Sequence, residues 1–269
     1  MDLIQKYNIP APRYTSYPTV PFWNNQQGWE AGLQENSGEP LSLYIHLPFC
    51  ERLCTYCSCN KYITVNHDHE APYIAAVLKE WNMSRQLFPS RPRLRELYLG
   101  GGTPNFFSPA NLRFLIETIL SGCDVMPDAA FAFEGHPNNT TYEHLQTLYQ
   151  LGFRRVSLGV QDLDLSVQTI INRIQPFENV ERVVKDARAL GYTSINFDLI
   201  YGLPLQTAKS IRQTIEKVML LYPDRISFYS YAHVPWVKGN GQRLFTDLGQ
   251  RLSGWPEGAL LVDQQEVLE

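Results

Sequence analysis

The chain has 269 residues, of which 44% are hydrophobic, and its formal net charge is -4. A chain of this length and apolar content can bury one sizeable core, so we expect a single domain. The acidic balance, the lack of any long Lys and Arg run, and the lack of an apolar run of the roughly 20 residues of a membrane helix argue against nucleic-acid and membrane partners.

Residues 1–40 are rich in Pro, Tyr and Trp and predict an irregular arm. The arm lacks the basic start and apolar middle of a signal peptide, which favours a cytoplasmic protein. From residue 41 to 236, short β-rich runs alternate with helical runs, a pattern typical of βα units around a parallel sheet. Residues 237–269 have no strong period and predict an irregular tail. We expect six strands, over residues 41–47, 94–100, 129–134, 153–160, 194–201 and 225–232.

Helices are predicted between these strands. Ser108 followed by Pro109 supplies an N-cap and a first residue with a pre-set φ. Thr140 and Glu143 match a capping box for the next helix, and Gly152 lies where a left-handed C-terminal residue belongs. Apolar residues at helical spacing predict three further helices that face the core, over residues 74–81, 180–187 and 211–218.

Four of the five cysteines lie within residues 50–59, directly after the first predicted strand. In a reducing cytosol, clustered cysteines hold metal or do redox chemistry more often than they form disulfides. Cys50, Cys54 and Cys57 have the spacing C-x3-C-x2-C and can surround one small metal centre from a single loop. A [4Fe-4S] cluster ordinarily takes four cysteines, so three would leave one iron open for chemistry. Zinc is the alternative metal, and the nearby histidines that could complete its ligand set are His46, His67 and His69.

A glycine motif or a polar residue ends most of the later strands. The carboxyl ends of parallel strands meet at one rim, where barrel enzymes place their chemistry. The run GGGTP at 100–104 lets backbone groups approach a ligand, although a flexible turn would also explain it. Glu134, Gln161 and Asp198 could hydrogen-bond an amine, a ribose or an adenine. Arg173 could bind a carboxylate, and the alternative interpretation is a solvated charge on a helix.

These motifs together resemble the radical S-adenosylmethionine superfamily and, within it, the oxygen-independent coproporphyrinogen III oxidase family. The resemblance runs from about Lys6 to about Pro235 through PRYTSYPT, YIHLPFC, LGGGTP, LGVQD, INFDLIYGLP and SYAHVP, in the family's order. It implies an α/β fold with a six-stranded partial (β/α) barrel, and a [4Fe-4S] cluster on Cys50, Cys54 and Cys57. Ten residues match positions that bind S-adenosylmethionine, of which the family holds two molecules: Tyr44, Tyr56, Gly101, Gly102, Thr103, Glu134, Gln161, Arg173, Asp198 and Ala232.

The reaction that this resemblance implies is oxidative decarboxylation of two propionate groups of coproporphyrinogen III to vinyl groups, giving protoporphyrinogen IX in porphyrin biosynthesis. A 5'-deoxyadenosyl radical would remove a hydrogen atom from each propionate β-carbon. Arg13, Tyr14 and the fourth clustered cysteine, Cys59, are candidates on the substrate side. The expected partners are the substrate and a reductant such as flavodoxin or ferredoxin, acting on a monomer.

The sequence departs from the family in two places. Residues 134–137 read EGHP, where the family has an acidic residue or Asn before the Pro. The family continues into a helical C-terminal domain, whereas this chain stops resembling it at about Gly249, so we expect that domain to be missing and an inactive fragment is one alternative. The others are a haem-binding chaperone, which lacks the PRYTSYPT arm and the fourth sulfur, another radical enzyme acting on a tetrapyrrole, and a structural zinc module.

Overall fold

A six-stranded parallel sheet organises the computed structural model, which describes residues 28–232. The strands are hydrogen-bonded in the order β1-β4-β5-β6-β7-β8, with every neighbouring pair parallel. Their bounds are Leu41–Leu47, Arg93–Gly101, Asp124–Gly135, Phe153–Gln161, Ser194–Tyr201 and Arg225–Ser230. The predicted α/β class and all six strands are confirmed. The predictions of an irregular tail and of a missing C-terminal domain concern residues outside the described range. Arg13 and Tyr14 also lie outside it.

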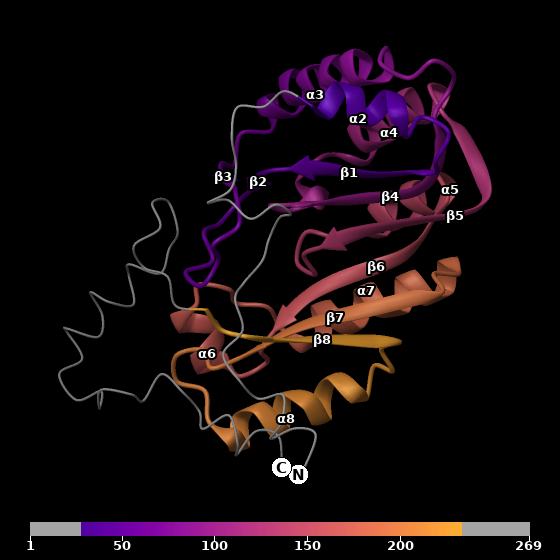
Figure 1. Ribbon diagram of the computed structural model, residues 1–269. Coiled ribbons are helices and arrows are strands. Elements are labelled where there is room, and N and C mark those ends of the chain that lie inside the picture. The colour runs from indigo at the N-terminus through magenta and orange to yellow at the C-terminus, as the bar shows by residue number, and fades with distance from the viewer. Residues whose placement is uncertain (1–27, 233–269) are drawn as a thin grey trace, which may run out of the picture.

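Helices follow the strands as the predicted βα pattern requires, and they cover one face of the sheet (Figure 1). The helices α3, α4, α5 and α7 contact one another in that order. The α-helices are α2 Trp29–Glu35, α3 Glu70–Arg85, α4 Pro109–Ser121, α5 Tyr142–Gln150, α6 Leu165–Ile170, α7 Phe177–Leu190 and α8 Ala208–Met219. Short elements near the cysteines are the strands β2 Phe49–Cys50 and β3 Tyr62–Ile63 and the 3-10 helices η2 His67–His69 and η3 Pro104–Phe106.

Two local predictions about these helices were wrong. The arm that we expected to be irregular contains α2. The capping box of α5 uses Thr141 and His144 rather than Thr140 and Glu143. The reason is that the Thr140 hydroxyl donates to the His136 carbonyl at 2.9 Å, in the turn before the helix, which leaves Thr141 as the N-cap.

The hydrophobic core lies between the sheet and its helices. Along a strand, apolar side chains that face the helices alternate with more polar side chains that face the other way. On β6 the residues buried beneath the helices include Val156, Leu158 and Val160. The residues that alternate with them lie on the inner face: Arg155, Ser157, Gly159 and Gln161. Parallel strands that are covered on both faces are usually apolar throughout, so this alternation marks an inner face that is not packed with apolar residues.

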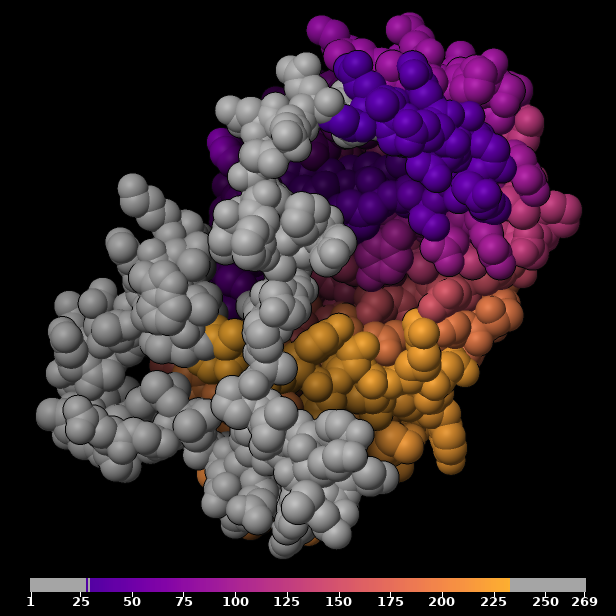
Figure 2. Space-filling model, viewed as in Figure 1, coloured from indigo at the N-terminus to yellow at the C-terminus, as the bar shows by residue number. Residues whose placement is uncertain are grey.

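The sheet curves so that its inner face forms a hollow. In the space-filling view, the surface of the middle strands recedes between the indigo and the orange parts of the chain (Figure 2). The carboxyl ends of the strands lie at one end of the molecule, where β2, β3 and α6 also lie (Figure 1). Within residues 28–232, no helix has both the length and the apolar character needed to cross a membrane.

Candidate cofactor and active site

A cavity of about 1240 Å³ begins at the carboxyl ends of the strands and continues along the inner face of the sheet. All four clustered cysteines line it. Most of the predicted cofactor residues line it too: Tyr56, Gly101, Gly102, Thr103, Glu134, Gln161, Arg173 and Asp198. Tyr44 and Ala232 are not among its described lining residues; Tyr44 lies on the edge strand β1, where its ring stacks on Tyr98. Binding of a cofactor by these residues stays a prediction.

The cysteine loop is anchored to the glycine run after β4. The Thr103 amide donates to the Phe49 carbonyl at 2.9 Å, and the Thr103 hydroxyl lies 3.4 Å from the Cys50 sulfur. The Gly102 amide donates to the Leu47 carbonyl at 2.9 Å. These bonds hold the first cysteine directly beside the glycine motif.

The other end of the loop is anchored to the segment that follows α6. The Thr55 amide donates to the Ile171 carbonyl at 3.0 Å, and the Asn172 side-chain amide donates to the Leu53 carbonyl at 2.8 Å. Asn172 has a φ of 54°, a left-handed conformation that Asn tolerates better than most residues. The loop is therefore held at both ends by segments far from it in the sequence.

Arg173 lies directly beneath the cysteines. One guanidinium nitrogen is 3.5 Å from the Cys54 sulfur, and another donates to the Gly159 carbonyl at 2.6 Å. The alternative interpretation of Arg173 as a solvated helix charge is wrong, because the residue follows α6 and its Nε atom is buried without a hydrogen-bond partner among the described residues. A buried cation beside a thiolate offsets part of the cost of burying the thiolate charge.

The thiols of the loop differ in acidity. A hydrogen bond from the Cys59 thiol lowers the pKa of Cys57, and the positive charge of Lys61 also lowers that pKa. Burial raises the pKa of Cys50, although the Thr103 hydroxyl acts in the opposite direction. The thiolate form is therefore more accessible at Cys57 than at Cys50.

Glycine is required in the run after β4 for two different reasons. Gly101 has a φ of 122°, a backbone conformation that residues with a Cβ atom rarely adopt. At Gly102 the obstacle is space, because an added Cβ would lie 2.4 Å from the Pro48 carbonyl oxygen and 2.9 Å from the Cys50 sulfur. The backbone here approaches the cysteine loop as closely as atoms allow.

Two half-buried carboxylates, Glu134 and Asp198, lie at the strand ends. Glu134 accepts hydrogen bonds from the Tyr98 hydroxyl at 3.1 Å and the Gly101 amide at 3.2 Å. Asp198 accepts from the Ser157 hydroxyl at 2.7 Å and the Asn196 amide at 2.9 Å. Burial raises the pKa of both carboxyl groups. Each is held in a fixed orientation, as a residue that binds a small polar ligand should be.

Gln161 ends β6 with a φ of 66°, a strained conformation for a non-glycine residue. Asn105, which sequence reasoning did not single out, lines the cavity with only 3% of its surface exposed. Neither polar atom of its side-chain amide has a hydrogen-bond partner within residues 28–232. Buried amides are normally hydrogen-bonded, so this unpaired amide at the cavity wall is consistent with a ligand-binding surface.

Two of the three histidines considered as zinc ligands have hydrogen-bond partners among the described residues. His46 is hydrogen-bonded to the Tyr44 hydroxyl at 3.0 Å and the Asn60 carbonyl at 2.9 Å. His67 donates to the Glu70 carboxylate at 2.7 Å, and its ring stacks on Phe106. Among the described residues, no three His, Cys, Asp or Glu side chains surround a single-ion site.

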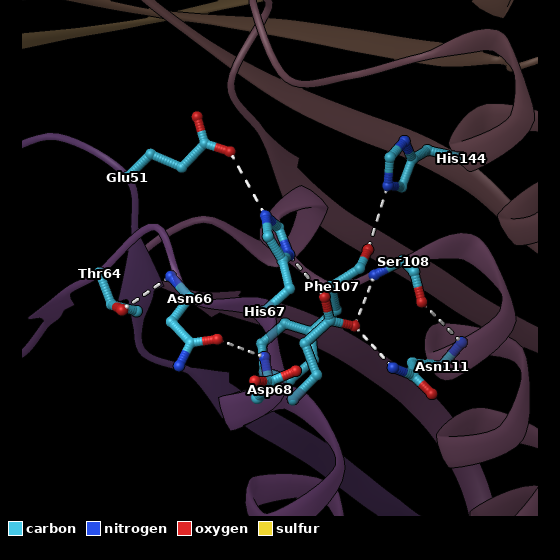
Figure 3. Close-up of polar contacts among 10 residues, drawn as sticks. Glu51, Thr64, Asn66, His67, Asp68, Phe107, Ser108, Asn111 and His144 are labelled. Atoms are coloured by element: carbon cyan, nitrogen blue, oxygen red, sulfur yellow. Dashed lines mark hydrogen bonds and ion pairs between the residues drawn. The ribbon is translucent and has the colours of Figure 1, made fainter.

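Glu70, at the start of α3, connects η2 with the first turn of α4, and Figure 3 labels its three partners His67, Ser108 and Asn111. Besides His67, its carboxylate accepts from the Ser108 amide at 2.8 Å and the Asn111 side-chain amide at 2.7 Å. It is 3% exposed. We expect Glu70→Ala to lower the free energy of unfolding by about 2 kcal/mol, because the half-buried Ser108 and Asn111 donors lose their acceptor. Urea denaturation would measure this loss.

The matched control is Glu80→Ala on the exposed side of α3, which should change stability by less than about 0.5 kcal/mol. Burial alone would raise the pKa of Glu70, but hydrogen bonds from Asn111, Ser108 and His67 outweigh it and lower the pKa below 4.5. A depressed carboxyl pKa stabilises the folded state above the unfolded pKa and stops doing so as the pH falls through the folded pKa. The difference in the free energy of unfolding between wild type and Glu70→Ala should therefore become smaller as the pH falls. A difference that stayed constant with pH would contradict this role of Glu70.

Comparison with known proteins agrees with this geometry. The family model described as "Radical SAM superfamily" matches residues 44–218. The chain therefore belongs to the radical SAM superfamily, and the fold resembles that of a radical S-adenosylmethionine methyltransferase from Kitasatospora setae at 16% identity and a TM-score of 0.53.

More specific similarity is to enzymes named oxygen-independent coproporphyrinogen III oxidase. That of Pseudomonas aeruginosa is 42% identical over 241 residues, which cover 87% of this chain and 52% of the relative. One from Helicobacter pylori is 43% identical over 248 residues, covering 88% of this chain and 54% of the relative. The structure of the Escherichia coli coproporphyrinogen III oxidase superposes with a TM-score of 0.82 at 36% identity, over 89% of this chain and 54% of that chain. These relatives confirm the resemblance stated from the motifs, and the chain spans about half of their length.

Proposed function

We propose that this chain catalyses the oxidative decarboxylation of coproporphyrinogen III to protoporphyrinogen IX, as the barrel of a radical S-adenosylmethionine enzyme. One observation carries the proposal: three cysteines on one loop lie at the rim of a cavity whose other walls bear a glycine run and two half-buried carboxylates. The relatives reported above are named coproporphyrinogen III oxidases, which supports this substrate.

The donor set at the rim suits a [4Fe-4S] cluster and S-adenosylmethionine. Cys50, Cys54 and Cys57 would hold the cluster, which leaves one iron for the amino and carboxylate groups of the methionine moiety. When bound and reduced, the pair supplies a 5'-deoxyadenosyl radical that removes hydrogen from the substrate. We assign contact with S-adenosylmethionine to eight residues of the cavity wall and propose a second molecule at the same site. Tyr44 and Ala232 remain candidates from the edge of the cavity.

The chain itself orients these groups. Glu134, held by Tyr98 and the Gly101 amide, accepts hydrogen bonds from a cationic amine at the rim. Asp198, held by Ser157 and Asn196, accepts hydrogen bonds from hydroxyl groups. Each propionate loses a β-hydrogen, carbon dioxide and one further electron, and the electron passes to an external acceptor. We also propose a cytoplasmic monomer that receives electrons from flavodoxin or ferredoxin.

The test is anaerobic reconstitution with iron and sulfide, followed by incubation with dithionite, S-adenosylmethionine and coproporphyrinogen III. We expect 5'-deoxyadenosine and protoporphyrinogen IX, with formation of both dependent on reductant. Tight haem binding without turnover would instead support a haem chaperone. 5'-Deoxyadenosine with a different porphyrin product would support another tetrapyrrole enzyme. Zinc without iron or sulfide would exclude the whole assignment.

A further inference from the structure

The cavity reaches well beyond the cysteine rim. It continues toward the amino ends of the strands, where its lining includes Arg155 on β6, Ser194 on β7 and Arg225 on β8. This deep part contains none of the cofactor residues discussed above. Two cationic side chains therefore line one wall of the cavity, away from the cysteines.

Strand register places both arginines on the inner face, below the rim. Arg155 is in register with Ser194, and Arg225 is in register with Asn196, two residues before Asp198. With a rise of about 3.3 Å per residue, the Arg225 level lies roughly 7 Å below Asp198. Only β7 separates β6 from β8, so the two strands are about 10 Å apart. Two extended arginine side chains can span that distance to a shared anion or to neighbouring anions.

The arginines are also unpaired. Within residues 28–232, neither Arg155 nor Arg225 makes a hydrogen bond to another side chain or an ion pair. Some other described arginines do have partners: Arg154, the outward-facing neighbour, donates to the Tyr149 and Phe153 carbonyls at 2.7 and 2.8 Å, and Arg188 pairs with Asp224. Glu96, the acidic side chain in the deep part of the cavity, accepts instead from the Ser42 hydroxyl at 2.7 Å.

We propose that Arg155 and Arg225 form a carboxylate-binding pair that holds propionate groups of the substrate while another propionate reaches the rim. Guanidinium groups bind carboxylates through paired, charge-assisted hydrogen bonds, and a chain of net charge -4 needs such local cations to bind a multiply charged anion. The identity of the ligand rests on the proposed function. The pair itself rests on the register, the cavity and the missing partners.

The test titrates the reconstituted full chain with coproporphyrin III, the stable oxidised form of the substrate, and follows porphyrin fluorescence. Arg155→Gln and Arg225→Gln should each raise Kd about tenfold, because each removes a charge-assisted hydrogen bond. Arg155→Lys should recover part of the affinity. Coproporphyrin III tetramethyl ester, which lacks the carboxylate charges, should bind wild type and variants equally.

Arg95→Gln is the matched control, since Arg95 is an exposed strand arginine that pairs with Asp128 outside the cavity. Iron content, S-adenosylmethionine affinity and thermal stability should be unchanged in all four variants. Equal affinity of wild type and both glutamine variants, an equal loss in Arg95→Gln, or no coproporphyrin III binding by wild type would each overturn the inference. Arginine-dependent binding without any turnover would uphold the pair and remove the proposed function, whereas turnover with unaltered binding by the variants would do the reverse.

Discussion

Replacing Cys54 with alanine is expected to remove the iron-sulfur cluster, lowering bound iron from about four atoms per chain to nearly none. Two remaining thiols on a short loop cannot hold four irons. The change also leaves Arg173, whose guanidinium lies 3.5 Å from the Cys54 sulfur, without that partner. Formation of 5'-deoxyadenosine should fall by more than about 100-fold, since even residues that only support a metal ligand cost 10- to 100-fold when lost. Iron and sulfide analysis with the visible absorption spectrum would measure the first effect, and chromatography the second.

The controls are Cys59→Ala and Cys123→Ala. Cys123 is buried away from the cavity lining, and Cys59 lies outside the C-x3-C-x2-C spacing. Both variants should keep their iron, although Cys59→Ala should raise the pKa of Cys57 by removing its hydrogen-bond donor. Full iron in Cys54→Ala together with loss of iron in Cys59→Ala would show that the ligand set is Cys50, Cys57 and Cys59 instead.

Local sequence patterns predicted the elements of this fold well. The strand over residues 194–201 was predicted from its apolar residues between two helical runs. Its observed bounds are those predicted. The N-cap at Ser108 was also predicted, because Ser followed by Pro is a signal within a single turn. The Thr140 box was wrong because the His136 carbonyl competes for the Thr140 hydroxyl, and that turn is not visible in a capping motif.

Site residues that belong to one short motif could be predicted from the sequence. Site residues that only the tertiary fold brings together were harder to predict. Cys50, Cys54 and Cys57 are close in sequence, so their convergence needs only a loop. Arg173 reaches Cys54 across 119 positions of the chain, and nothing in its own neighbourhood indicates burial. Arg155 was missed although FRRVSLGVQ alternates visibly, because periodicity shows which side chains share a face and not that the face encloses a cavity.

Among substitutions that add one methyl group in the described part of the chain, Gly102→Ala is expected to lower stability the most. The new Cβ would lie 2.4 Å from the Pro48 oxygen, 2.6 Å from the Pro48 carbonyl carbon and 2.9 Å from the Cys50 sulfur. Two of these neighbours are backbone atoms, so the strain cannot be relieved by a side-chain rotation. We expect a loss of about 3 kcal/mol in the free energy of unfolding, at the upper end for an added methyl group, because β2 and the cysteine loop must move. Displacement of Cys50 should also lower iron content and weaken S-adenosylmethionine binding at least about tenfold.

The matched control, Gly32→Ala, is expected to raise the free energy of unfolding rather than lower it. Gly32 lies within α2, and a Cβ there would meet nothing within 4 Å. Gly32→Ala should stabilise the helix by roughly 0.5–1 kcal/mol because alanine loses less backbone entropy. Urea denaturation and iron analysis of the two variants then separate a general effect of the added methyl group from the contact at Pro48. If Gly102→Ala kept wild-type stability and iron content, the close approach of the glycine run to the cysteine loop would be wrong. One of the contacts that position Cys50 at the cavity rim would then be lost, leaving those with Thr103 and Thr64.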